Sequence, residues 1–323
     1  MLLNMKNARD EVALSEVIGF VLLLGLVVAA LALYMVYVVP INGRENEITQ
    51  MNYIQNQFTD YKFTLDNIRT SMLVNNLSPV MTSTSIYLGT PGGNTGAGGL
   101  FVYLLKPQTS SGTLSINNTG DTFNIDSSSY HGSPAQMGEF PINVTSLEYR
   151  SNNNYWIQQR YYYELGGVFL SQLDGNTNLI SPLIAITNTS NSSVVVNIAP
   201  VNIVGGGNIS GNGPIRVDTR MRVLAAYNIS ESNYTPNYWV NLSYTSSDPG
   251  TAAMWLNIFN NTATSGQIDA SSYKTGSATN NGKTTVFIYI TGTRQDYPHV
   301  SLYVQHAEFY VTFFNIVSGV TGQ

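Results

Sequence analysis

The sequence contains no cysteine and little charge. Its 323 residues include 14 basic and 19 acidic side chains, so 10% of them are charged and the formal net charge is −5. An ordinary soluble domain carries about 25% charged residues. The absence of cysteine excludes disulfides, thiolate nucleophiles and cysteine-based zinc sites. The acidic balance argues against a nucleic-acid partner, because such proteins present clusters of Lys and Arg to the phosphates. Asn, Ser, Thr and Gly replace the missing charge, as is typical of exported surface proteins.

Signatures of catalysis are also scarce. Two of the three histidines, His299 and His306, lie seven residues apart on a predicted strand and so face opposite sides of it. No His-Glu-x-x-His, G-x-S-x-G or G-x-x-x-x-G-K-[ST] motif occurs. Asp174 begins a segment similar to the start of a calcium loop, but the glycine and the final glutamate of such a loop are missing. We therefore predict a non-enzymatic protein with no cofactor and no metal, and keep a calcium ion in another loop as an alternative.

A long uncharged run stands near the N-terminus. Val17 to Val39 are 23 residues without a charge, which as a helix would be about 35 Å long against a bilayer core of about 30 Å. A secretory signal has an apolar region of only about 7–15 residues. Lys6 and Arg9 precede the run and favour a cytoplasmic N-terminus. We expect a hydrophobic helix over residues 14–40 that contacts membrane lipid through residues 17–39.

Residues 14–19 read LSEVIG, and this segment resembles the S-x-V-I-G opening of archaeal type IV pilin-like proteins. The resemblance covers residues 9–40, and the rest of the chain is not recognised. It implies that a prepilin-type peptidase removes a leader of residues 1–13 by cutting between Ala13 and Leu14. It also implies that the apolar helix then packs with like subunits in a filament core, where Glu16 assists assembly by pairing with a neighbour's α-amine. A cut after Glu11 would make Glu16 the fifth residue and stays open as a second register. We favour Ala13 because the peptidase reads the small residue before the cut.

A second helical pattern follows the apolar run. Pro40 and Gly43 are expected to break or bend the first helix. An amphipathic helix is then predicted over residues 44–76, because apolar residues recur at spacings of three and four. They are Ile48, Met51, Ile54, Phe58, Tyr61, Leu65, Ile68 and Met72. Two interpretations of this apolar stripe are open: it packs under the protein's own β-sheet, which we favour, or on the same helix of neighbouring subunits.

The remainder, residues 81–323, reads as strands and polar loops. Short runs rich in β-branched and aromatic residues alternate with Gly, Asn, Ser and Pro. Asp174 and Gly175 suggest a hairpin turn, and residues 250–260 suggest one helix. The predicted fold class is α+β: an N-terminal transmembrane or filament-core helix and an amphipathic helix, followed by a large antiparallel β-sandwich, jelly-roll-like ectodomain. We favour a single β domain over two sub-domains divided at residues 152–154.

Ten N-x-[ST] triplets occur, against about seven expected by chance from the composition. Their number therefore says little, and glycosylation follows mainly from the predicted export. Triplets in predicted loops, such as those of Asn191 and Asn208, are favoured over those within strands. The candidate acceptors are Asn117, Asn188, Asn191, Asn208 and Asn233.

Three functional interpretations follow. The leading one is a non-enzymatic, pilin-like surface protein that is a subunit of, or is associated with, a cell-surface filament. Its β domain would lie outside the cell membrane, or on an extracellular filament after leader removal. The second is a single-pass, membrane-anchored adhesin or sugar-binding module that does not polymerise. The third is a tethered hydrolase, which requires carboxylates converging in a cleft.

Overall fold

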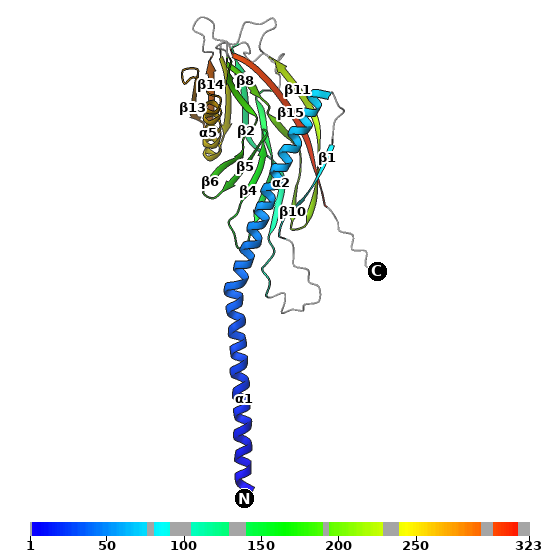
Figure 1. The fold of residues 1–323 in the computed structure, drawn as a ribbon, viewed down its shortest axis with the longest axis vertical. Helices are drawn as coiled ribbons and strands as arrows, with labels where there is room; N and C mark the ends of the chain where they lie inside the picture. The colour runs from blue at the N-terminus through cyan, green and yellow to red at the C-terminus, as the bar shows by residue number, and fades with distance from the viewer. Residues whose placement is uncertain are drawn as a thin grey trace.

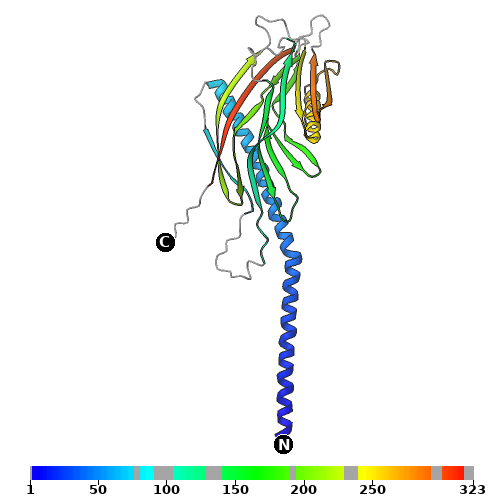
Figure 2. The ribbon, with the colours of Figure 1, turned by 180° about the vertical axis from the view of Figure 1, so that it is seen from behind.

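The computed structural model describes residues 2–75, 81–90, 105–128, 140–189, 194–228, 239–291 and 300–315, with side chains of the N-terminal helix described from Glu16 to Leu73. A helical stem projects from a β-rich head, and the upper half of the helix continues along the head (Figure 1, and from behind in Figure 2). The fold is α+β, with a long apolar N-terminal helix followed by a large domain of two curled sheets, as the sequence predicts.

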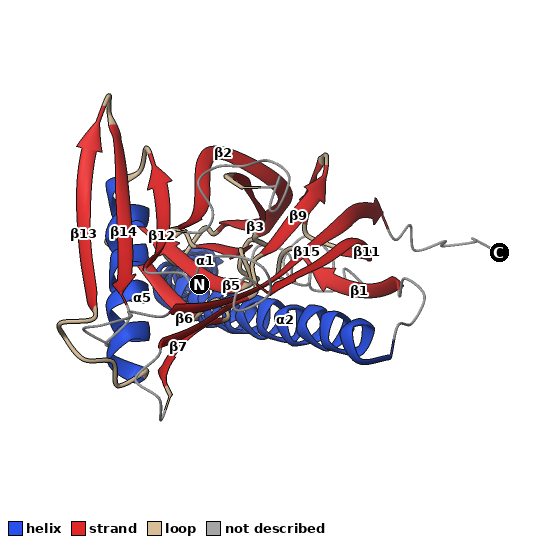
Figure 3. Ribbon diagram, turned by 90° about the horizontal axis from the view of Figure 1, so that it is seen from above, coloured by secondary structure: helices blue, strands red, loops and turns tan. Residues whose placement is uncertain are grey.

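The stem and the amphipathic helix form one continuous rod. Its parts in order are α1 (Leu2–Leu33), a π-helical turn η1 (Tyr34–Val38) and α2 (Val39–Asn75). The helix does not break at Pro40, but it bends where α1 passes into α2 (Figures 1 and 3), which is one of the two outcomes expected from the sequence. The N–H of Val39 bonds to the carbonyl of Tyr34, five residues back. This wider turn accommodates the proline ring, which in a regular α-helix would clash with the carbonyl four residues earlier. The helices expected over residues 14–40 and 44–76 are therefore joined without a hinge.

The apolar stripe on α2 is buried inside the head. Its buried members pack against residues of both sheets in one hydrophobic cluster: Met51, Ile54, Phe58, Tyr61, Leu65 and Ile68. Ile48 and Met72, at the two ends of the stripe, are half-buried. The structure thus confirms that the stripe packs on the protein's own sheets. Six of its side chains are unavailable to neighbouring subunits for the same reason.

The head contains two sheets. The first has the order β1 (Met81–Tyr87), β11 (Pro214–Asn228), β15 (Val300–Asn315), β8 (Val194–Ile198) and β7 (Ile184–Asn188), with β9 (Val201–Gly205) also on β15. The second has the order β13 (Tyr273–Asn280), β14 (Lys283–Thr291), β12 (Trp239–Ser246), β2 (Ser111–Ser127), β3 (Ile142–Asn152), β4 (Arg160–Glu164), β5 (Gly167–Gln172) and β6 (Gly175–Ile180), with β10 (Asn208–Gly211) on β2. The pairs are antiparallel except that β8 and β9 run parallel to β15.

Two helices lie in separate hydrophobic cores of the head. Figure 3 shows α5 (Pro249–Ser265) beside β12, β13 and β14, and α2 beneath β1, β11 and β15. Strand β4 contributes to both cores. Tyr161 and Tyr163 belong to the cluster around α2, and Tyr162 belongs to the cluster around α5. A strand buried on both faces therefore connects the two helices.

The local elements agree with the sequence except for one turn. The β5–β6 hairpin exists, but Gln172 pairs with Gly175, so its turn is Leu173-Asp174, one residue earlier than expected. Strands β8 and β9 are separated at Ala199 and Pro200, and both pair with β15. Helix α5 starts at Pro249, with Asp248 as its N-cap, close to the helix expected over residues 250–260.

Candidate functional site

The lower part of the rod is an uncovered apolar surface. Side chains from Val17 to Val38 are exposed, including Phe20 at 65%, Leu22 at 68% and Leu26 at 71%. The helix is long and apolar enough to cross a membrane, and the apolar segment is not covered by any part of the head that the structure describes. Soluble monomers rarely expose apolar patches beyond a few hundred Å². The apolar surface of the stem is therefore suited to contact lipid or other helices.

Polar and aromatic groups gather where the stem enters the head. Tyr34 and Tyr37 are exposed near the top of the apolar segment. One to two turns above Tyr37, the guanidinium of Arg44 lies 4.5 Å from the centre of the Trp156 ring. Tyrosine, tryptophan and arginine prefer the boundary between hydrocarbon and water. This belt marks the upper end of the segment that a bilayer would cover.

Glu47 fixes the head to the rod directly above that boundary. Its side chain is 1% exposed, and it accepts hydrogen bonds from the backbone N–H groups of Asn154, Tyr155 and Trp156 at 2.6, 2.8 and 2.7 Å. Gly43 lies one helical turn below, where an added Cβ would come within 2.3 Å of the Tyr155 ring. The glycine expected to break the helix instead permits this close approach.

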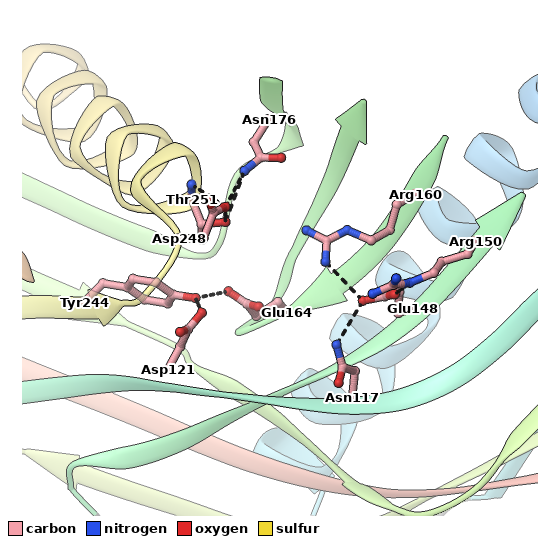
Figure 4. A network of polar contacts seen from close by, with 10 residues as sticks. All are labelled: Asn117, Asp121, Glu148, Arg150, Arg160, Glu164, Asn176, Tyr244, Asp248 and Thr251. Carbon is pink, nitrogen blue, oxygen red and sulfur yellow. Dashed lines mark hydrogen bonds and ion pairs between the residues drawn. The ribbon is translucent and has the colours of Figure 1, made fainter. Parts of the chain in front are cut away.

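A polar network crosses the second sheet between the two cores (Figure 4). One part centres on Glu148, which is 1% exposed. Its Oε2 accepts from the amide of Asn117 at 3.2 Å and from Nη1 of Arg160 at 3.3 Å. Arg150 on the same strand donates to Oε1. A buried carboxylate is tolerated here because it has two guanidinium partners and an amide donor.

The other part of the network holds two carboxyl groups on one phenol. The hydroxyl of Tyr244 lies 3.0 Å from Oδ2 of Asp121 and 2.8 Å from Oε1 of Glu164, and Nε1 of Trp255 is 3.4 Å from the same Glu164 oxygen. Burial, reinforced by the charge of Asp121, raises the pKa of Glu164 to about 7 against the lowering effect of its hydrogen bonds and of Arg160. A phenol has one proton to donate, so it satisfies only one ionised carboxylate at a time. The geometry therefore favours a neutral Glu164 below pH 7.

Asp248 caps helix α5 beside this network. Its carboxylate caps the helix through the N–H groups of Gly250 and Thr251 and also accepts from the amide of Asn176. Burial opposes its charge, but the bonds from Thr251, Gly250 and Asn176 outweigh burial and lower its pKa. This is the behaviour expected of an N-cap.

The converging carboxylates do not form an open cleft. Asp121 is 4% exposed and Glu164 is 2% exposed, with Trp255 packed on the Tyr244 ring at 4.6 Å between ring centres. Glu148 and Glu164, which the sequence alone could not place, have different partners. Among the residues that the structure describes, no three His, Asp or Glu side chains gather as a metal site would require. The tethered hydrolase therefore gains no support from these groups.

The predicted site residues are scattered rather than brought together. Ala13 and Leu14 lie within α1, before the residues whose side chains are described, and Glu16 is exposed at the lower end of the bare segment. Asn188 is exposed at the end of β7, and its amide donates to the carbonyl of Gln267 at 3.3 Å. Asn208 is exposed but begins strand β10 instead of lying in a loop.

The other candidate residues lie either inside the head or outside the residues that the structure describes. The amide of Asn117 is held by Glu148, so this candidate acceptor is already engaged. Asn191, Asn233 and His299 lie outside the described residues. His306 is buried in β15 with its ring beside Phe140, and Glu308, two residues on, is half-buried and pairs across the strands with Arg222 at 3.2 Å. Glu308 therefore makes a polar contact across the strands.

Comparison with known proteins gives no relative: no family model, no curated protein and no solved structure matches this chain. The sequence did not single out Glu47 or the Asp121–Tyr244–Glu164 cluster. Glu47 could have been noted as one acidic residue at the start of the amphipathic helix. The cluster has no local signal in the sequence, because Tyr244 is 123 positions from Asp121 and 80 positions from Glu164.

Proposed function

We propose that this protein is a non-enzymatic, pilin-like surface subunit, inserted in the cell membrane by its stem and then assembled with like subunits after a prepilin-type peptidase removes residues 1–13. The observation that supports this best is the uncovered apolar stem, continuous with a helix whose upper half is fixed inside the head. A stem of this kind fits lipid before assembly and the stems of other copies after it. The head would then face the outside of the cell. The high content of Asn, Ser and Thr and the low content of charged residues in this chain are typical of exported proteins.

A second candidate is a single-pass anchored adhesin or sugar-binding module that never polymerises. The belt of Tyr34, Tyr37, Arg44 and Trp156 favours it, because such a belt suits a helix that stays at a fixed depth in a bilayer. The two candidates differ in the N-terminus of the mature protein and in whether the protein leaves the membrane fraction.

The test compares membrane and sheared-filament fractions of native cells and determines the N-terminus and intact mass of the protein in each. We expect mature protein that begins at Leu14 in the sheared fraction. Glu16→Ala should keep export and folding but lose the filament fraction. Glu45→Ala removes another exposed helix carboxylate, on α2 beyond the apolar run, and should assemble normally. Wild-type protein found only in membranes, with residues 1–13 retained, would support the static anchor instead.

A further inference from the structure

A pocket opens on the first sheet beyond the part of β15 that α2 covers. Side chains at odd positions of β15 face α2, and Ala307 and Phe309 are buried there. Towards the start of the strand, Tyr303 and Gln305 on the same face are only half-buried. A cavity of about 290 Å³ lies there, lined by Arg69 of α2, by Pro182 and Ile184, and by Asn197, Tyr303 and Gln305.

Arg69 is buried beside this cavity with few of its donors satisfied. It is 5% exposed. Its Nη1 reaches Oε1 of Gln305 at 3.4 Å, at the outer limit of a hydrogen bond, and its Nη2 is 3.7 Å from Oδ1 of Asp66. Its Nε has no hydrogen-bond partner among the described residues. Buried guanidinium groups are normally paired and hydrogen-bonded.

Within the part of the chain that the structure describes, the charges around Arg69 do not balance. Lys62, which is 3% exposed, donates to Oδ2 of Asp66 at 2.6 Å. Asp66 is thus the single carboxylate that the described residues offer to two buried cations. The phenol of Tyr163 is also close, but burial raises its pKa well above the ordinary value, so it stays neutral. Counted over the described residues, Lys62, Asp66 and Arg69 carry one excess positive charge next to the cavity.

We propose that this cavity is a binding site for a small monoanionic carboxylate carried on a sugar-sized ring, an acidic sugar of the uronate type. The planar fork of Arg69 suits a carboxylate, which it binds through two parallel N–H donors. One negative charge neutralises the group, whereas a phosphate dianion would overcompensate it. Asn197, Tyr303 and Gln305 offer partners for hydroxyl groups, and Pro182 and Ile184 offer an apolar face for ring C–H groups. The volume is near the lower end for small-molecule sites, about 300 Å³.

This inference concerns the head alone, so it holds whether the stem polymerises or stays in the membrane. Its test is calorimetric titration of the full-length protein in a non-ionic detergent with D-glucuronate, and with D-glucose, acetate and inorganic phosphate as comparisons. We expect one glucuronate per chain and at least a tenfold weaker response to each comparison compound. Equal binding of glucose would overturn the role of the carboxylate, equal binding of acetate would overturn the sugar ring, and tighter binding of phosphate would overturn the monoanion.

Variants locate the site. Arg69→Gln should weaken glucuronate binding by about tenfold or more, the loss expected for a charge-assisted hydrogen bond. Gln305→Glu introduces a fixed carboxylate beside the guanidinium; it should abolish glucuronate binding and raise the melting temperature. Arg222→Gln changes an exposed arginine paired with Glu308 on the opposite face of β15 and should leave binding unchanged. If Arg69→Gln fails to fold, Gln305→Glu still decides, because unchanged binding by that variant would refute the assignment.

Discussion

Neutralising Glu164 should stabilise the head at alkaline pH. In the folded protein this carboxyl is surrounded by groups from four elements: Asp121 of β2, Tyr244 of β12, Trp255 of α5 and Arg160 of β4. Glu164→Gln keeps an oxygen to accept from Tyr244 and Trp255 and removes the ionisable proton. The variant therefore isolates the free energy of placing a charge at this position.

The sign and size follow from the pKa. Burial raises the pKa of Glu164 from 4.5 to about 7 in the folded protein, whereas the unfolded chain keeps the ordinary value. The bound proton therefore stabilises the folded state fully below pH 4.5, and this stabilisation is lost as the pH rises through about 7. The difference between the two values is worth about 3 kcal/mol at about 1.4 kcal/mol per pKa unit. For a domain of this size that amounts to roughly 6–12 °C in melting temperature.

Thermal unfolding of the full-length protein, followed by tryptophan fluorescence at pH 5 and pH 8, measures the effect. All three tryptophans, Trp156, Trp239 and Trp255, lie in the head, so the signal reports the head and not the stem. Wild type should melt lower at pH 8 than at pH 5, and Glu164→Gln should lose most of that difference. The same pH dependence in both proteins would refute the reasoning.

Glu148→Gln is the matched control, because it is the same substitution at a buried glutamate of the same sheet. Glu148 has two arginine partners, Arg150 and Arg160, which the neutral side chain would leave without an opposite charge. We expect it to destabilise the head at both pH values, by about 1.5–3 kcal/mol. A gain in stability from Glu148→Gln at pH 8 would show that burial alone, not the missing positive partner, governs these sites.

Three further predictions concern the rod and its junction with the head, each measured by denaturant unfolding of the full-length protein. Leu65→Ala should lower the free energy of unfolding by about 2–5 kcal/mol, because it leaves a cavity under the sheets. Phe63→Ala, two residues earlier on a side chain that is 54% exposed, should change it by less than about 0.5 kcal/mol. Equal effects of the two variants would contradict the burial of the stripe. Glu47→Ala should cost more than about 2 kcal/mol, because three backbone N–H groups lose their acceptor, and a neutral result would mean that water replaces it. Gly43→Ala should cost about 1–3 kcal/mol through overpacking, and Gly25→Ala, with open space around it, should leave unfolding of the head unchanged.

The helices were the most predictable part of the fold because their signals are local. Spacings of three and four between Met51 and Met72 fix which face of α2 is buried, and the structure buries that face. The uncharged run from Val17 to Val39 likewise forms the bare stem. At Pro40 the sequence predicted a break or a bend, and the helix bends without ending because a π turn accommodates the proline ring.

Strands β2 and β11 show what a search for apolar runs in the sequence does not detect. Strand β2 has no apolar run to mark it, because its middle is polar and exposed, around a register shift between Asn118 and Thr122. In strand β11 the charges alternate with other residues at a period of two, with Arg216 and Arg220 on the outer face and Val217 buried. A strand with a charged outer face gives a clear alternation but no apolar run. Pairings between distant strands, such as β8 with β15, have no local signal.

The buried polar groups were least predictable because they depend on those distant pairings. Glu164 meets Tyr244 only after β4 and β12 have both joined the second sheet and α5 has closed over them. Arg69 meets Gln305 only after α2 has packed across β15. In a sequence with 10% charged residues, each of these side chains is individually unremarkable, and its partner is set by the tertiary fold.

The junction between stem and head determines how motion of one affects the other. The helix is continuous through Pro40, Glu47 holds three N–H groups of the head one to two turns above, and Gly43 lets the Tyr155 ring pack directly on the helix. A hinge at this place would let each head tilt independently of its stem. With the rod unbroken and the junction fixed, the axial rotation of the stem also sets the direction that the head faces. If stems of several copies pack in parallel, the contacts between their heads are therefore determined by the packing of the stems, and the surface that each head presents outward is fixed in the same step.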